Sequence, residues 1–260
     1  MEIEQEIVEK SDLIIIATNS EKELFCRSYS SPKISSEEIF KKTIVATLGV
    51  DHKLFNFEKI EKLRESARKK FLPEKFRQSK SFYMLGRIVP EKRQLETSEA
   101  FAKLLSKNPE LNVILSIFGG ALNRNYFNKI ENLVATFPDL VKERIFFHGR
   151  QSPDEAIASG DIFIGPSTWE SWYMALTEAM TCGRPSIVSD TPVLREVAQN
   201  SALFLNPNIP IVDSLTLEME QLVLDADLRH ELQKMGKKNS RKYNWLDSAK
   251  EILSAINHYV

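Results

Sequence analysis

The sequence predicts an α/β fold, in which a Rossmann-like parallel sheet carries helices on both faces, over residues 81–245. Apolar runs of strand length alternate with helical patterns throughout this region, which is typical of parallel sheets. The runs are continuously apolar, as expected of strands that are buried on both faces. The chain has 260 residues, of which 42% are hydrophobic, so it can bury such a core without disulfides.

The elements of this region follow one another in a regular order. Strands are expected at 81–86, 111–118, 144–148, 161–165, 185–189 and 202–205. Helices are expected between them, including 173–182 and 192–199, and further helices close the chain. In open sheets of this kind ligands bind beyond the carboxyl ends of the strands, so the segments that follow the strands hold the candidate site.

Residues 1–51 predict a smaller unit with a short helix that ends at Lys10, strands at 12–18 and 43–50, a helix over 21–28 and a loop over 28–36. The second helix is expected to begin at a capping box of Ser20 and Glu23. Two strands do not make an independent domain, so we interpret 1–51 as the remnant of a larger, acceptor-side N-terminal domain. Residues 1–45 are expected to expose an apolar face that needs a partner.

Two further segments complete the predicted organisation. Residues 52–80 are rich in charge and keep helical spacing at Phe57, Ile60, Leu63 and Ala67, so we interpret them as a linker that contains one helix. Residues 246–260 are expected to form a C-terminal helix that packs toward the N-terminal part. The N-terminal remnant and the C-terminal helix, which lie on either side of the predicted domain of 81–245 in the sequence, are therefore both expected to belong with another lobe.

The composition excludes several classes of protein. The formal net charge is −1, so no basic field attracts nucleic acid. Cys26 and Cys182 lie in no CxxC pair and the four histidines do not cluster, so neither a disulfide framework nor a zinc site is expected. The apolar run Leu13–Ala17 is too short to span a bilayer, and residues 1–10 lack the pattern of a signal peptide. We expect a cytoplasmic protein without a transmembrane segment, and peripheral contact with the inner membrane face stays open.

Basic residues follow the first strand of the predicted domain. Gly86 allows a close turn, and Arg87 and Lys92 lie five residues apart as the chain enters the next helix. Two cations in this place suit a diphosphate, with the guanidinium as a fork and the ammonium as a point charge. Solvated surface cations are the alternative interpretation.

Acidic residues follow the strand at 161–165. Glu170 lies in the loop and Glu178 lies in the helix that follows, whose N-terminus offers free amides to an anion. A carboxylate can accept hydrogen bonds from a pair of sugar hydroxyls. This segment could therefore hold phosphates on amides and sugars on carboxylates, although Glu178 could equally be a charge on the helix surface.

These segments, in this order, resemble the donor domain of the retaining GT-B glycosyltransferases of family 4. The resemblance covers roughly residues 40–250 and rests on Gly49-Val50-Asp51, Gly86-Arg87 with Lys92, Pro166-Ser167 with Glu170 and Glu178, Gly183-Arg184-Pro185, Ser189-Asp190, Glu196, Asn206-Pro207 and Tyr243-Asn244-Trp245. It implies that most of an acceptor-binding half is absent from this chain.

The resemblance also implies a role for each candidate residue. Arg87 and Lys92 would grip the diphosphate of a nucleotide sugar and neutralise the leaving group. Glu170, with the backbone of Ser171, Trp172, Tyr173 and Met174, would contact the transferred sugar, and Glu178 would bind the ribose. The backbone near Gly149 and Arg150 would hold the base. The catalytic residues would be Arg87, Lys92 and Glu170, and no metal or other cofactor is expected.

The chain departs from the family at several positions. Ser171 and Tyr173 replace glycines that usually follow the first glutamate, Arg93 follows Lys92 where glycine is common, and the segment 152–160 is a few residues short. Other features have open interpretations: Gly119-Gly120 as a phosphate contact or a tight turn, His148 as part of a base site, and Trp172 as a stacking or a packing residue. Asp225-Ala226-Asp227 matches a metal-binding pattern, but Asp227 is expected to cap a helix. Cys182 is expected in the core, and Trp245 is expected to anchor the last helix.

The predicted function is transfer of a hexose from a nucleotide-diphosphate sugar to an acceptor with retention and without a metal, in partnership with an N-terminal GT-B domain or subunit. Two alternatives remain, a non-catalytic nucleotide-sugar-binding module and a GT-B epimerase or phosphorylase-type enzyme. The base, the sugar, the acceptor and the pathway are not predicted.

Overall fold

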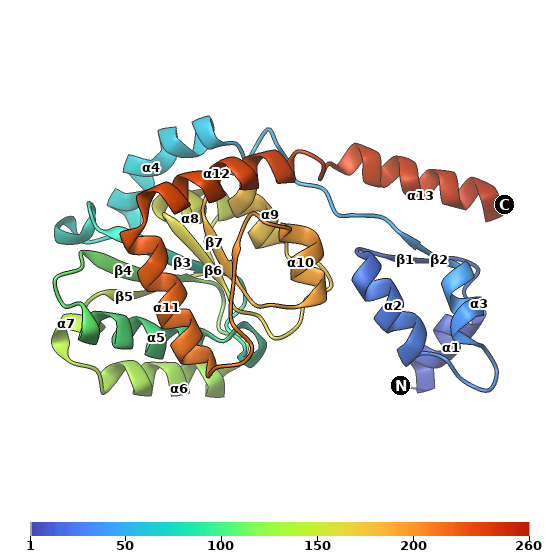
Figure 1. Cartoon of the computed structure of the whole chain (residues 1–260), viewed down its shortest axis with the longest axis horizontal. Helices are drawn as coiled ribbons and strands as arrows, with labels where there is room; N and C mark the ends of the chain where they lie inside the picture. The colour runs from blue at the N-terminus through green and yellow to red at the C-terminus, as the bar shows by residue number, and fades with distance from the viewer. Residues whose placement is uncertain (1, 260) are drawn as a thin grey trace.

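The computed structural model describes residues 2–259, which form a larger and a smaller part (Figure 1). The strands of the larger part are β3 (Lys80–Leu85), β4 (Val113–Phe118), β5 (Ile145–Gly149), β6 (Ile162–Gly165), β7 (Ser186–Val188) and β8 (Leu203–Phe204). They pair in parallel in the order β5-β4-β3-β6-β7-β8. The direction of winding reverses between β3 and β6, which is where ligands bind in sheets of this type. The predicted fold class is confirmed.

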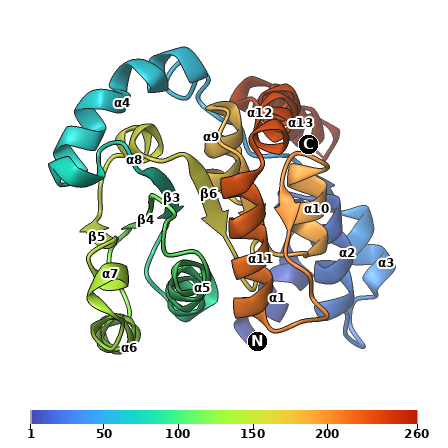
Figure 2. The ribbon, with the colours of Figure 1, turned by 60° about the vertical axis from the view of Figure 1, so that its left-hand side comes forward.

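Helices cover both faces of this sheet, as Figure 2 shows. On one face lie α5 (Gln94–Lys107), α6 (Arg124–Ala135), α7 (Asp139–Lys142) and α11 (Ile211–Leu224). On the other lie α4 (Phe57–Phe71), α8 (Pro153–Ser159), α9 (Met174–Thr181) and α10 (Pro192–Ala198). Helix α12 (Ala226–Ser240) packs against α9 and α11, and the short 3-10 helices η1 (Glu74–Phe76) and η2 (Pro90–Lys92) flank β3.

The apolar strands form cores on both faces of the sheet because neighbouring side chains alternate between them. In β3, Phe82 joins the core beneath α5 and contacts Phe101, with the ring centroids 6.4 Å apart. The next residue, Tyr83, joins the opposite core and contacts Phe163 at 5.5 Å. Both faces are therefore buried, and this explains why the strand sequences are continuously apolar.

Helix α4, in the segment expected as a linker, packs against α8. Its Ile60 and Ala67 are buried in the same core as Tyr83. Its Arg68 is also largely buried and donates hydrogen bonds to the carbonyls of Arg77 and Ser79, each at 2.8 Å. The helix is thus held to the sheet by both apolar and polar contacts.

The smaller part consists of α1 (Glu2–Lys10), β1 (Ile14–Ile16), α2 (Asn19–Ser28), α3 (Ser36–Lys41) and β2 (Thr43–Val45). The two strands pair in parallel but are only three residues long, much shorter than predicted. Helix α3, which was not predicted, begins at a capping box of Ser35 and Glu38. Helix α2 is capped by Thr18 rather than Ser20, since Thr18 lies directly before the first helical residue and its hydroxyl accepts the Glu21 N–H.

Apolar side chains of the smaller part are exposed, as the sequence predicts. Ile3 is 75% exposed and Ile7 is 59% exposed on α1, and Leu24 is 58% exposed on α2. Within residues 2–259, no helix combines the length and the apolar character that crossing a membrane requires. The described residues therefore leave these three side chains largely uncovered.

The two parts meet at two places. Helix α13 (Trp245–Tyr259) lies beside the smaller part in Figure 1, and its Ser248 hydroxyl donates to the carbonyl of Thr47. Gly49 passes so close to α13 that an added Cβ would lie 2.2 Å from the Trp245 nitrogen, so no larger residue fits. At the second place, Glu196 of α10 accepts hydrogen bonds from the Asn19 and Ser20 amides, both at 2.8 Å, at the start of α2.

Candidate functional site

A cleft of about 670 Å³ opens at the carboxyl edge of the larger sheet. Its walls are the segments that follow four neighbouring strands: 85–92 after β3, 118–122 after β4, 150–153 after β5 and 170–178 after β6. A cleft of this volume suits a small organic ligand, and it lies at the point where the strand order reverses.

Glycines allow the first two segments to approach each other. An added Cβ on Gly119 would lie 1.7 Å from the carbonyl oxygen of Gly86, and Gly119 has a φ of +158°. The backbone of this region is tied by hydrogen bonds from Gly86 N to Phe118 O at 2.9 Å and from Gly119 N to Gly149 O at 2.8 Å. Gly119-Gly120 therefore forms a tight turn that also lines the cleft.

Lys92 is held inside the cleft rather than in solvent. Its ammonium forms a hydrogen-bonded ion pair with Glu170, and both side chains are only 14% exposed. The same ammonium lies 4.3 Å from the centroid of the Tyr173 ring, within the range of a cation–π interaction. The solvated-cation interpretation is thus wrong for Lys92. Arg87 is exposed and forms no ion pair with any residue from 2 to 259, so both interpretations stay open for it.

The loop that carries Glu170 is fixed to the turn that carries Lys92. The Thr168 N–H donates to the carbonyl of Glu91 at 2.8 Å, and this bond joins the segment after β6 to η2. Arg93, at the end of η2, adopts a left-handed conformation with a φ of +54°. These contacts place two side chains that are 78 residues apart within reach of each other.

Tyr173 fills the space beneath the ion pair. Its side chain is buried against Gly165, where an added Cβ would lie 2.6 Å from the tyrosine ring. Burial is the main cause that raises the pKa of Tyr173 above its ordinary value, so its hydroxyl stays protonated. Trp172 points elsewhere, into a T-shaped contact with Tyr243 at 4.8 Å, which supports the packing interpretation.

Glu178 lies further into α9 and also lines the cleft. Burial raises its pKa to about 7, and its carboxylate makes no hydrogen bond or ion pair within the described residues. No side chain caps the amino end of α9, which begins at Met174 beside Tyr173. The cleft therefore offers a poorly solvated acid and an uncapped helix terminus on the same wall.

The structure brings together most of the predicted site residues but not all. Gly86, Arg87, Lys92, Arg150, Glu170, Tyr173, Met174 and Glu178 line the cleft, whereas Gly149, Ser171 and Trp172 do not. Lining residues that sequence reasoning missed include Leu85, Phe118, Leu122, Gln151, Pro153 and Ala175. Leu122, Gln151 and Pro153 follow strands, and this position was the signal that could have found them. Leu85 and Phe118 end β3 and β4, and Ala175 lies in α9.

Two other candidates lie outside the cleft. His148 stacks on Phe118 at 4.4 Å, and burial lowers its pKa to about 4, so it is a neutral packing residue. Asp225, rather than the predicted Asp227, caps α12 by accepting the Leu228 N–H at 2.8 Å.

Cys182 is fully buried, as expected. Within the described residues, no group of three or more acidic, histidine or cysteine side chains could hold a metal ion.

Comparison with known proteins identifies the family. The model of the glycosyl transferases group 1 family matches residues 65–239, two thirds of the chain. The chain belongs to this family. Its fold is that of the GT-B glycosyltransferases, as in HepE from Anabaena in complex with UDP and glucose, which it matches with a TM-score of 0.81 at 16% identity over 99% of this chain and 66% of that one. Sucrose-phosphate synthase from Thermosynechococcus elongatus gives a TM-score of 0.76 at 20% identity, over 99% and 60% of the two chains.

Curated relatives agree with this membership. The chain is 26% identical over 255 residues to a D-inositol 3-phosphate glycosyltransferase of Corynebacterium jeikeium, covering 96% of this chain and 58% of that protein. It is 28% identical over 185 residues to UDP-Gal:alpha-D-GlcNAc-diphosphoundecaprenol alpha-1,3-galactosyltransferase of Escherichia coli, covering 68% and 45% of the two chains. The chain thus spans about half of the length of these relatives.

Proposed function

We propose that this chain is the donor-binding part of a family 4 glycosyltransferase that transfers a hexose from a nucleoside-diphosphate sugar with retention of configuration. One observation carries the proposal: Lys92, Glu170 and Glu178 line a single cleft at the carboxyl edge of the sheet. The cleft has the cation that a diphosphate requires and the acceptors that sugar hydroxyls require.

The leaving diphosphate would be bound by Arg87 and Lys92. Breaking the bond between sugar and phosphate loads negative charge onto the leaving oxygens, and preorganised cations at that point stabilise the transition state. Lys92 is already oriented by Glu170 and Tyr173, whereas Arg87 is exposed and free to fold onto the phosphates. The second part of the proposal is that these two cations neutralise the leaving diphosphate without a metal ion.

The sugars would be bound by the two acids. When the diphosphate engages Lys92, the Glu170 carboxylate is released to accept hydrogen bonds from hydroxyls of the hexose. Glu178, which has no partner among the described residues, would accept both hydroxyls of the ribose. The base would lie beside Arg150 and Gln151 at the end of β5.

The acceptor would be bound by a second lobe that packs on the smaller part. The exposed apolar side chains of α1 and α2 and the share of the relatives that this chain does not match support this part of the proposal. We place the complete enzyme in the cytoplasm, with turnover that depends on both lobes.

A non-catalytic nucleotide-sugar binder is the second candidate. The side chain of Tyr173 occupies a position where the family usually has glycine, and this would favour binding without transfer. Turnover measured with and without the second lobe separates these functions, and water or phosphate as the acceptor would indicate an epimerase or phosphorylase-type enzyme.

Calorimetric titration with UDP-, GDP- and ADP-hexoses tests the proposed site. Arg87→Ala and Lys92→Ala should each weaken donor binding by about 1.5–3 kcal/mol, because each removes a charge-assisted contact with the diphosphate. Lys103→Ala is a matched control, since Lys103 pairs with Asp213 on the surface away from the cleft. Donor binding that survives both substitutions would refute the assignment of the diphosphate.

A further inference from the structure

A second cavity, of about 550 Å³, lies at the opposite edge of the same sheet. It opens between α4 and the amino ends of β3 and β6, where Lys80 and Asp161 lie. The six residues of β3 separate it from the donor cleft by roughly 20 Å, at about 3.3 Å per residue. The two cavities therefore do not share lining residues.

Most acids around this cavity are already paired. The carboxylate of Glu61 accepts a hydrogen bond from the buried Arg184 at 2.7 Å, and Glu65 forms an ion pair with Lys69 at 2.6 Å. Only Asp161 remains to balance the other cations of the cavity. The net charge of the cavity is thus set by Asp161 and the basic residues around it.

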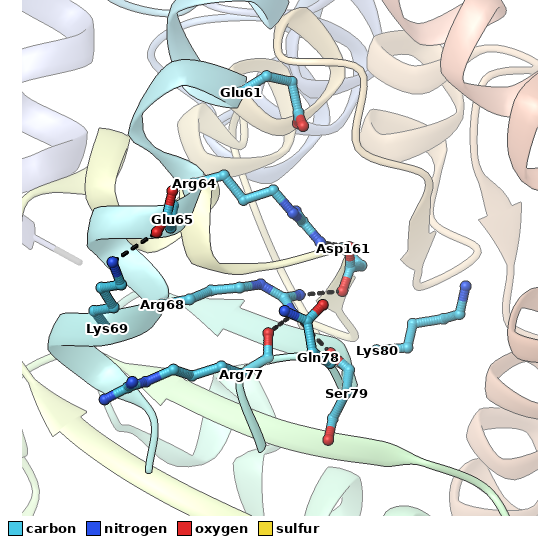
Figure 3. Close-up of a pocket in the computed structure, with 10 residues that line it drawn as sticks. All are labelled: Glu61, Arg64, Glu65, Arg68, Lys69, Arg77, Gln78, Ser79, Lys80 and Asp161. Atoms are coloured by element: carbon cyan, nitrogen blue, oxygen red, sulfur yellow. Dashed lines mark hydrogen bonds and ion pairs between the residues drawn. The ribbon is translucent and has the colours of Figure 1, made fainter. Parts of the chain in front are cut away.

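Four cations line the cavity, and two of them form ion pairs with this carboxylate. Figure 3 shows Arg64 and Arg68 reaching Asp161 from α4, whereas the side chains of Arg77 and Lys80 extend away from it toward opposite sides. Within residues 2–259, the side chain of Arg77 donates only one long hydrogen bond, from Nε to the carbonyl of Leu72 at 3.4 Å. The ammonium of Lys80 makes no hydrogen bond within the described residues.

This arrangement of like charges is costly without a counter-ion. Burial is the main cause that lowers the pKa of Lys80. The nearby guanidinium groups of Arg229, Arg64 and Arg68 also lower this pKa, whereas Asp161 raises it. An anion in the cavity would relieve this repulsion.

We propose that this basic cavity binds a phosphate-bearing small molecule. Guanidinium groups are suited to the planar, bidentate recognition of phosphate oxygens, and three of the four cations are arginines. The recessed position of Arg68, whose side chain is 8% exposed, favours a small ligand over an extended polyanion. The separation of Arg77 from Lys80 in Figure 3 fits a ligand with more than one anionic group.

Calorimetry with inorganic pyrophosphate at constant ionic strength tests the proposal. The titration uses the Arg87→Ala/Lys92→Ala protein, so that binding at the donor cleft does not contribute. Pyrophosphate should bind this protein, and adding Arg77→Ala/Lys80→Ala should raise the dissociation constant at least about tenfold. Adding Lys75→Ala/Lys103→Ala instead removes the same charge outside the cavity and should leave the constant unchanged.

Absence of pyrophosphate binding, or a dissociation constant that is equal in both sets of variants, would overturn the proposal. If the alanine variant does not fold, Arg77→Gln/Lys80→Gln removes the charges with less loss of packing and gives the same test. Flotation with phosphatidylglycerol vesicles, against phosphatidylcholine, identifies the source of the phosphate. Vesicle binding that pyrophosphate displaces would indicate a lipid headgroup, and vesicle binding without any pyrophosphate binding would contradict the small-molecule site.

Discussion

The two ends of β6 each carry an acid that is paired with cations, yet the two acids are held differently. At the amino end, Asp161 accepts hydrogen bonds from Arg64, Arg68 and the Ser81 amide. At the carboxyl end, Glu170 meets the single ammonium of Lys92. The first arrangement joins α4 to the sheet, whereas the second leaves a cation that a ligand can take. Asp161 therefore has a structural role beside the basic cavity, whereas Glu170 would compete with a ligand for its cation.

Asp161→Ala gives the largest expected effect. Burial alone would raise the pKa of Asp161, but Arg68 and Arg64 beside it hold that pKa below its usual range. Removing the carboxylate leaves two largely buried guanidinium groups unbalanced, so we expect a loss of about 3–5 kcal/mol in the free energy of unfolding. Urea denaturation measures this loss.

Glu143→Ala is the control for this substitution. Glu143 and its partner Lys75 form an exposed pair, with 43% and 61% of their side chains accessible. We expect a change of at most about 1 kcal/mol, as is typical of surface ion pairs. Equal losses in the two variants would contradict the structural role of Asp161.

Donor binding should depend on pH through Glu178 at the other end of the molecule. Its pKa in the folded protein is about 7, and the ionised form is the better acceptor for ribose hydroxyls. Affinity should therefore rise about tenfold between pH 6 and pH 8, as the ionised fraction rises. Titration of Glu178→Gln should give weak binding that does not change over this range; the same pH dependence in the variant would exclude Glu178 as its source.

The folding stability should show the opposite trend at the same residue. Because the folded-state pKa of Glu178 is raised above its ordinary value of 4.5, its protonated form is favoured on folding. The stability that wild type has relative to Glu178→Gln should fall as pH rises from about 5 to 8. Thermal melts of both proteins across this range measure the difference.

Glu170→Gln should have a smaller effect, which raises the affinity for the nucleoside diphosphate and lowers the affinity for the complete donor. The substitution frees Lys92, so the nucleoside diphosphate without the sugar should bind roughly threefold more tightly. The complete donor should bind less tightly, because an acceptor for the hexose hydroxyls is lost. Parallel titrations measure both constants, and a decrease in affinity for both ligands would show that Glu170 does not compete for Lys92.

The fold of the larger part could be predicted because each of its strands appears in the sequence as an apolar run of strand length. The smaller part was predicted less well. Strands β1 and β2 pair over only three residues each, although the apolar runs that predicted them are longer. Helix α2 is capped at Thr18 because its hydroxyl accepts the Glu21 N–H, while the Glu21 carboxylate accepts the Ala17 N–H. The helix α3 was missed because its six residues show no clear periodicity.

The sequence predicted at which edge of the sheet the site lies, but not which side chains of the site contact one another. The order of strands requires Lys92 and Glu170 to lie at the same edge, but their pairing depends on the loop geometry that Thr168 and Glu91 fix. Likewise, His148 ends the expected strand, yet it stacks on the ring of Phe118 and does not line the cleft. The basic cavity was not predicted, since Arg64 and Arg68 read as ordinary charges of a helix.

A crystal structure with the nucleoside diphosphate of the preferred donor bound tests the central claim most directly. The account predicts phosphate oxygens within about 3 Å of the Lys92 ammonium and of the Arg87 guanidinium, with the pair between Lys92 and Glu170 opened. A diphosphate bound away from both cations, with that pair intact, would contradict the claim.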